Sequence, residues 1–147
     1  MILTKKLTAA LLSILIAIAF MPSMTFASGG GGTGTVIDPE NATIEGDGSY
    51  IVDSDGFTGD IVVRSGNVDI TLNGELRGTI TVEKDAAATL DLNGNNITTT
   101  DKATDTIFNK GSLNIKGEGT VSSARAAVAN APGAACVADG GTFMSSN

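Results

Sequence analysis

The chain alternates apolar and polar residues in short stretches, and one of these stretches recurs. Ile70-Thr71-Leu72-Asn73-Gly74 and Leu90-Asp91-Leu92-Asn93-Gly94 match at an offset of 20. Leu113-Asn114-Ile115-Lys116-Gly117 continues the series at an offset of 23, and Gly119-Thr120-Val121 returns as Gly141-Thr142-Phe143 at an offset of 22. A repeat of this length, made of short alternating strands, is typical of a solenoid whose coils bury their inward faces against one another.

The remaining sequence also predicts short strands between Gly, Asn and Asp turns. Alternation begins around Thr35–Ile44, and no convincing amphipathic helix follows. The Ala-rich run Ser123–Ala131 has the composition of a helical turn, which Pro132-Gly133 would end. The predicted strands are Tyr50–Val52, Asp60–Val63, Val68–Leu72, Thr79–Val82, Thr89–Leu92, Ile107-Phe108, Ser112–Ile115 and Thr120-Val121.

An antiparallel sandwich or meander is an alternative to the solenoid. Asn73-Gly74 is a strong signal for a two-residue hairpin turn. A hairpin at this point would pair Leu72 with Glu75 and Ile70 with Arg77, so an apolar row would face a charged row. The Asn-Gly steps are better interpreted as turns that lead from one side of a coil to the next.

A leucine-rich repeat is a second alternative, because Leu90-x-Leu92-x-x-Asn95-x-Ile97 fits its core pattern. Glu75 and Glu118 replace the pattern's Asn in the other two units, and no unit has a helical stretch. These departures favour the solenoid.

Three stretches carry a resemblance to a known family, namely Leu90–Ile97, Gly111–Val121 and Gly140–Phe143. They look like exported bacterial proteins with a right-handed parallel β-helix of the pectate-lyase-like superfamily. The resemblance implies an all-β chain that forms one right-handed parallel β-helix, or β-solenoid, of about five coils. In such helices Asn side chains at one turn position stack coil over coil, and Asn73 and Asn93 are the candidates here.

The alternation also predicts which side chains point into the solenoid. Parallel strands of successive coils lie about 4.8 Å apart, so we expect Leu72, Leu92 and Ile115 in one column. The expected inward residues are Ile70, Leu72, Ile80, Val82, Leu90, Leu92, Ile97, Ile107, Leu113, Ile115, Val121 and Val137.

Positions 1–27 have the pattern of a secretory signal peptide. Lys5 and Lys6 form a basic start, Leu7–Phe20 is a largely apolar run, and Met21–Ala27 ends in small residues. The run is shorter than the roughly 20 residues that span a bilayer, although an uncleaved membrane anchor is the alternative. We therefore expect a cleaved helical signal peptide, a mature start near Ser28 and a secreted or cell-surface protein.

The domain organisation follows from this pattern. Residues 28–34 are a Gly-rich flexible linker, and residues 35–147 are the solenoid domain, with most coils in residues 44–143. The divergent segment Thr35–Phe57 is the candidate cap of the N-terminal end, whereas the sequence stops soon after Phe143 without a cap. We therefore expect either truncation at the C-terminal end or end-to-end self-association with another chain.

Charge and cysteine content narrow the possible partners. The chain has a net charge of −7, and about −9 if Lys5 and Lys6 are removed with the signal, which disfavours nucleic acid and anionic lipid. The single cysteine, Cys136, has no partner for an internal disulfide. We interpret it as a small buried apolar residue, with a reactive or intermolecular thiol as the alternative.

The densest group of oxygen ligands is Asp53-Ser54-Asp55-Gly56-Phe57-Thr58-Gly59-Asp60. Ca²⁺ takes six to eight oxygens, often from carboxylates at alternating positions around a Gly turn. Asp53, Asp55 and Asp60 are therefore weak calcium candidates, with solvated turn residues as the alternative. No other cofactor is expected.

Carbohydrate binding usually needs exposed aromatic rings. After the signal pattern the aromatic residues of the chain are Tyr50, Phe57, Phe108 and Phe143. Phe108 and Phe143 lie in apolar strands and are expected in the core. Tyr50 and Phe57 flank the acidic turn and are the weak ligand candidates.

Catalysis has little support in the sequence. The chain contains no His, which removes the commonest general base, and no catalytic residue is assigned. The function expected is an exported, non-catalytic structural or adhesive surface module that contacts a cell-surface or extracellular polysaccharide or protein. The alternative, which rests on the resemblance, is a polysaccharide-binding or polysaccharide-degrading, lyase-like protein.

Overall fold

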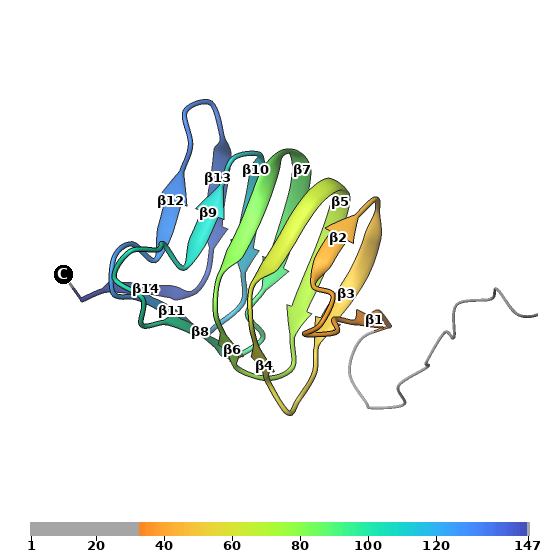
Figure 1. Ribbon diagram of the computed structural model, residues 1–147, viewed down its shortest axis with the longest axis horizontal. Helices are drawn as coiled ribbons and strands as arrows, with labels where there is room; N and C mark the ends of the chain where they lie inside the picture. Colours follow the sequence, from red (N-terminus) through yellow and green to blue (C-terminus); the bar gives the residue numbers. More distant parts are fainter. Residues whose placement is uncertain (1–32, 147) are drawn as a thin grey trace, which may run out of the picture.

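The computed structural model describes residues 33–146, and these residues form a parallel β-solenoid of about five turns (Figure 1). The described chain contains strands and turns but no helix, which confirms the predicted all-β class. The predicted signal peptide and residues 28–32 of the predicted linker lie outside the described residues.

Each coil has three sides, which we call faces 1, 2 and 3 in chain order. In the first coil these are β2 (Thr43–Glu45), β3 (Gly48–Val52) and β4 (Phe57–Thr58). The second and third coils begin with long strands that turn through the corner from face 1 to face 2. They consist of β5 (Ile61–Leu72) and β6 (Leu76–Arg77), then β7 (Ile80–Asp91) and β8 (Asn96–Thr99).

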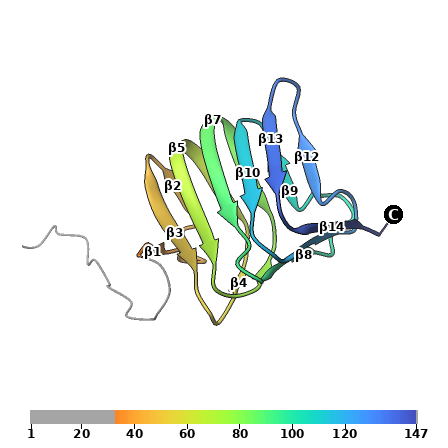
Figure 2. The same ribbon diagram turned by 180° about the vertical axis from the view of Figure 1, so that it is seen from behind.

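The last two coils have three separate strands each. They consist of β9 (Ile107–Asn109), β10 (Ser112–Lys116) and β11 (Thr120–Ser123), then β12 (Val128–Asn130), β13 (Ala135–Asp139) and β14 (Thr142–Ser145). Face 2 is seen from outside in Figure 2, where β3, β5, β7, β10 and β13 lie side by side. All pairings between these named strands are parallel, so the Asn-Gly steps do not form hairpins.

The N-terminal end is covered by a short segment. β1 (Thr35–Val36) pairs with β3, and Ile37 inserts into the core with 6% of its surface exposed. The cap is therefore shorter than the predicted Thr35–Phe57, because β2, β3 and β4 already belong to the first coil.

The core is a set of apolar columns that run along the solenoid. Of the predicted inward residues, Ile70, Leu72, Ile80, Val82, Leu90, Leu92, Ile97, Ile107, Leu113, Ile115 and Val121 are buried. Val137 is 61% exposed, so its predicted burial is wrong. It pairs with the exposed Asn114 on the outer side of face 2, and its neighbours Cys136 and Ala138 take the inward positions.

The predicted burial of Cys136 is also wrong, although its inward position opposite the buried Leu113 fits the pattern. Cys136 is exposed because β13 is the last strand of face 2 in the described chain, so no further coil covers it there. Its thiol therefore lies on the last strand of face 2 that the structure describes.

The predicted column of Leu72, Leu92 and Ile115 is wrong only in its third member. Ile115 lies opposite Leu90, and Leu90 lies opposite Ile70. Leu92 lies beside Leu72, one residue after the paired Thr71 and Asp91. Apolar residues alternate along β7 and β10, so a slip of two residues buries the same face in either register. The repeat pattern therefore identified the inward face but not the register of β10.

The offset of 22 between Thr120-Val121 and Thr142-Phe143 is confirmed, since these pairs lie opposite each other in β11 and β14. Phe143 occupies the predicted inward column but is 39% exposed. β14 is the last described strand of face 3, so within the described chain no further coil covers Phe143.

Two glycines show how closely neighbouring coils pack at one corner. Gly46 and Gly66 occupy the same corner of successive coils with φ angles of +87° and +88°. A Cβ at Gly66 would meet the backbone of Gly46 and Asp47, whereas nothing lies within 4 Å of a Cβ at Gly46. Both sites need the left-handed conformation, but only Gly66 also needs the missing side chain.

We predict that Gly46→Ala lowers the free energy of unfolding by about 1 to 2 kcal/mol, the cost of a left-handed non-Gly residue. Gly66→Ala should cost at least about 2 kcal/mol more, because two coils must separate. Urea unfolding of both variants measures the difference. Equal losses would contradict the close stacking of these corners.

Candidate functional site

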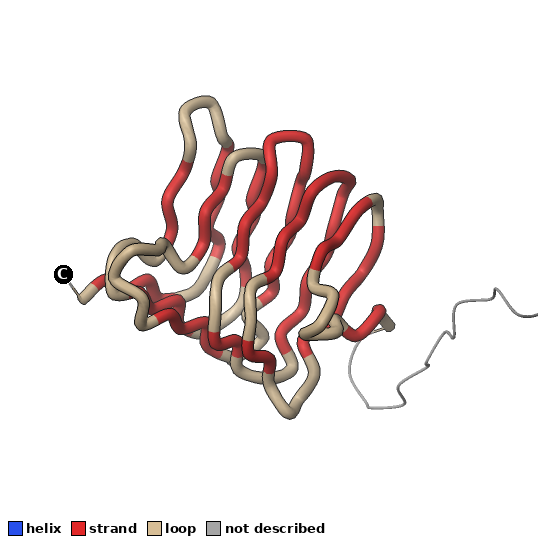
Figure 3. Tube along the Cα trace, viewed as in Figure 1, coloured by secondary structure: helices blue, strands red, loops and turns tan. Residues whose placement is uncertain are grey.

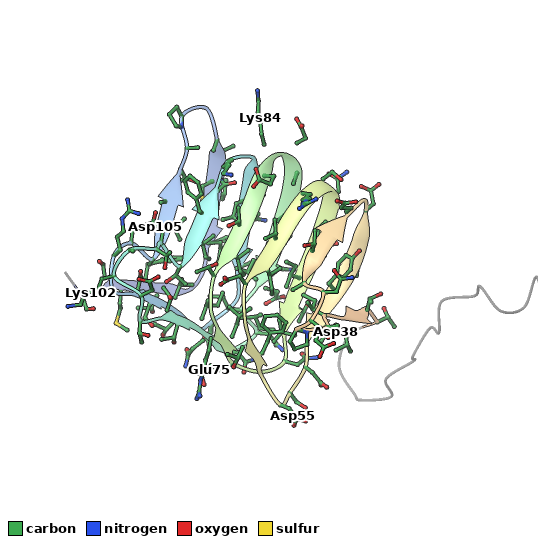
Figure 4. The ribbon with its side chains drawn as sticks, viewed as in Figure 1. Asp38, Asp55, Glu75, Lys84, Lys102 and Asp105 are labelled. Carbon is green, nitrogen blue, oxygen red and sulfur yellow. The ribbon has the colours of Figure 1, made fainter. Side chains whose placement is uncertain are left out.

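The three predicted calcium ligands are not brought together. Asp53 and Asp55 lie in the turn between β3 and β4, and Figure 4 shows Asp55 at the tip of that turn. Asp60 lies at the next corner, between β4 and β5. Within residues 33–146 no group of three His, Cys, Asp or Glu side chains could hold a metal ion. These carboxylates therefore need another explanation.

Two of the three have a structural role. Asp53 Oδ1 accepts the backbone N–H of Ser54 at 2.7 Å. Asp60 Oδ1 accepts the backbone N–H of Thr79 at 2.9 Å and its hydroxyl at 2.8 Å, which joins the second coil to the third. Asp47 binds Asn67 N–H in the same way at 2.7 Å across another corner. Side-chain oxygens thus satisfy backbone donors at corners between coils.

The predicted aromatic ligands do not form an exposed pair. Phe57 is 4% exposed and belongs to the inward column of Leu76, Ile97 and Val121. Tyr50 is half-buried and packs against the core at the N-terminal end. A sugar ring needs an accessible aromatic face, so the buried ring of Phe57 is not such a platform.

The predicted stacking of Asn73 and Asn93 is confirmed. Asn93 Nδ2 donates to Asn73 Oδ1 at 3.2 Å and to the Leu72 carbonyl at 3.1 Å. The side chain of Asn95 reaches the same carbonyl at 2.8 Å. Two consecutive coils are therefore connected by amides at the corner between faces 2 and 3.

A second asparagine pair was not predicted. Asn109 is fully buried, donates to Asn130 Oδ1 at 2.9 Å and to the Ala135 carbonyl at 2.8 Å, and accepts Gly111 N–H at 3.1 Å. The signal was present in the sequence, because Ile107-Phe108-Asn109 and Val128-Ala129-Asn130 share an apolar-x-Asn pattern at an offset of 21. This pattern is difficult to recognise in the sequence because each of the two strands has only three residues.

Charged side chains also join neighbouring coils on the outer surface. Arg64 Nη1 lies 3.3 Å from Glu45 Oε1, Lys110 Nζ lies 2.9 Å from Glu83 Oε1, and Lys116 Nζ lies 3.5 Å from Asp91 Oδ2. All are solvent-accessible, so each contributes at most about 1 kcal/mol to stability.

One hollow of about 810 Å³ lies at the corner between faces 1 and 2. The turn at Lys110-Gly111 is short there, while the turns of the flanking coils extend further. The walls are mostly small side chains and backbone, with Lys84 at the outer edge (Figure 4). Lys84, Asp85 and Lys110 are the charged residues among its lining.

A smaller hollow of about 320 Å³ lies at the corner between faces 3 and 1. We call it the corner pocket, and its lining is Thr79, Thr81, Ala103, Thr104, Asp105, Phe108 and Arg125. The predicted core position of Phe108 is wrong, because Phe108 pairs with Thr81 on the outer side of face 1 and is half-buried. Lys110 Nζ lies 5.4 Å from the centre of its ring.

An ion pair and a hydrogen bond connect the two loops at the rim of the corner pocket. Arg125 Nε lies 3.4 Å from Asp105 Oδ1, and Arg125 Nη1 donates to the Ala103 carbonyl at 3.2 Å. The Asp105 side chain is only 11% exposed, whereas that of Arg125 is 56% exposed. The corner pocket thus combines an aromatic ring, three threonines and one acid–base pair.

Comparison of the chain with protein-family models, with curated proteins and with solved structures finds no match. Across the described residues, no helix has the length and apolar character needed to cross a membrane.

We predict that Asp60→Ala lowers the free energy of unfolding by about 1 to 2 kcal/mol, because two hydrogen bonds to a carboxylate are lost. Asp55→Ala is the matched control and should change stability by less than about 0.5 kcal/mol. Thermal and urea unfolding check both values. An equal effect of the two substitutions would refute the structural role of Asp60.

Proposed function

We propose that this protein is an exported, non-catalytic structural or adhesive module of a bacterial cell surface. The observation that carries the proposal is the use of polar side chains between coils. Asp47, Asp60, Asn93 and Asn109 all satisfy groups of a neighbouring coil. These side chains hold neighbouring coils together. A stack held in this way presents a rigid, extended surface, as a structural or adhesive module needs.

The chemistry of the chain also supports a non-catalytic function. The sequence contains no His, and the carboxylates of Asp53, Asp55 and Asp60 are divided between two different corners of the solenoid. General acid–base catalysis needs such groups within hydrogen-bond reach of one substrate atom. Binding without turnover needs only a shaped surface, which the solenoid provides.

Export is supported by the sequence alone. The basic start, the apolar run Leu7–Phe20 and the small residues before Ser28 form the pattern of a cleaved signal peptide. N-terminal sequencing of the protein recovered from the culture medium or cell surface should give Ser28 as the first residue.

The alternative is a polysaccharide-binding or polysaccharide-degrading protein, suggested by the resemblance to the pectate-lyase-like superfamily. A shared fold does not fix a shared activity. Polysaccharide binding without degradation is compatible with both proposals, and the corner pocket supports it because it presents an aromatic ring beside polar groups.

We predict that the full chain releases no unsaturated sugar products from insoluble polysaccharides. The test incubates the chain with a panel of acidic and neutral polysaccharides and follows both the bound protein and the ultraviolet absorbance of unsaturated products. Retention without product supports an adhesive module. Time-dependent product formation that scales with protein concentration would contradict the proposal and establish a lyase-like activity.

A further inference from the structure

The corner between faces 3 and 1 changes along the solenoid. Two residues connect β4 to β5 and β6 to β7, whereas seven connect β8 to β9 and four connect β11 to β12. Figure 3 draws these longer loops in tan beside the C-terminal end, and Lys102 and Asp105 are labelled on the first of them in Figure 4. Insertions in repeat proteins map to loops on one face, which is often the binding face.

The two loops hold each other in a defined shape. Arg125 of the second loop contacts both Asp105 and the Ala103 carbonyl of the first. The Thr106 hydroxyl donates to the Ser122 carbonyl at 2.8 Å, which ties the first loop to β11. The corner pocket is therefore preorganised, so a ligand need not pay for ordering its walls.

The lining offers two kinds of contact. Phe108 provides a half-buried aromatic ring on the floor formed by face 1. Asp105 and Arg125 provide an acceptor and a donor on the rim, and Thr79, Thr81 and Thr104 add hydroxyl groups. A pyranose ring has the matching form, because its C–H groups pack on an aromatic ring while its hydroxyls both donate and accept.

Charge decides which class of sugar fits. Asp105 and Arg125 form one neutral pair, and Glu83 and Lys110 beside Phe108 form another. The chain as a whole carries a net charge of −7, which repels polyanions. A volume of about 320 Å³ is near the lower end for small-molecule sites, as expected for one ring rather than a long chain.

We propose that the corner pocket binds one neutral pyranose ring of a glycan, with the ring on Phe108 and its hydroxyls at Asp105 and Arg125. This inference deepens the proposed function by naming the partner of the adhesive module, and it rests on that function. The ring of Phe108 and the carboxylate of Asp105 are the specificity-determining groups.

The test titrates the full chain with neutral hexasaccharides of glucose, mannose, xylose and N-acetylglucosamine, and with a galacturonate oligomer, by isothermal titration calorimetry. At least one neutral oligomer should bind, and the galacturonate oligomer should bind at least tenfold more weakly. Phe108→Leu keeps an apolar side chain but removes the aromatic ring, and should weaken binding about five- to tenfold. Asp105→Asn should weaken it by a similar factor.

Lys102→Ala is the matched control, because Lys102 lies on the same loop but does not line the pocket. It should leave the affinity unchanged, and circular dichroism melts show whether each variant is folded. Absence of binding by every neutral oligomer, a preference for the galacturonate oligomer, or full affinity in folded Phe108→Leu would each overturn the site. None of these outcomes depends on product formation, so failure of the site is distinguishable from failure of the proposed function.

Discussion

The structure depends on the stacking of one coil on the next. A single coil has too few residues to enclose its own apolar side chains, so it buries them only against neighbouring coils. The inward residues Ile70, Leu90 and Ile115 illustrate this constraint, since each is at most 1% exposed and lies directly opposite its counterpart in the next coil. The backbone hydrogen bonds between parallel strands fix the register in which these side chains stack. Strand pairing and core packing therefore depend on each other.

Corners are the weak points of such a stack, because backbone groups there leave the ladder and must find other partners. The chain supplies these partners from side chains. Asp60 binds Thr79 at one corner, and the buried Asn109 binds Asn130 and the Ala135 carbonyl at another. Among residues 33–146 no buried side-chain nitrogen or oxygen lacks a hydrogen-bond partner. Asp53 and Asp60, two of the three residues that suggest a calcium site in the sequence, thus have a structural explanation.

The fold was predictable because alternation and a short regular repeat are direct consequences of stacked parallel coils. The stacking of Asn73 and Asn93 was predictable for the same reason. The register of β10 was not, because Leu113 and Ile115 bury the same face after a slip of two residues. The corner pocket was not predictable either, since Asp105, Phe108 and Arg125 come from two loops and a strand that are brought together by the pairing of β9 with β7 and of β11 with β8.

The register of β10 is the most direct test of this account. Thr89 and Asn114 are opposite each other on the outer side of face 2, where neighbouring Cα atoms lie about 4.8 Å apart. Asp91 and Asn114 would be opposite in the register that the repeat pattern predicts, but here they are about 8 Å apart, beyond the range of a disulfide. With Cys136 replaced by Ser, the Thr89→Cys, Asn114→Cys pair should oxidise to an internal disulfide and the Asp91→Cys, Asn114→Cys pair should keep free thiols. The reverse result would contradict the stacking described here.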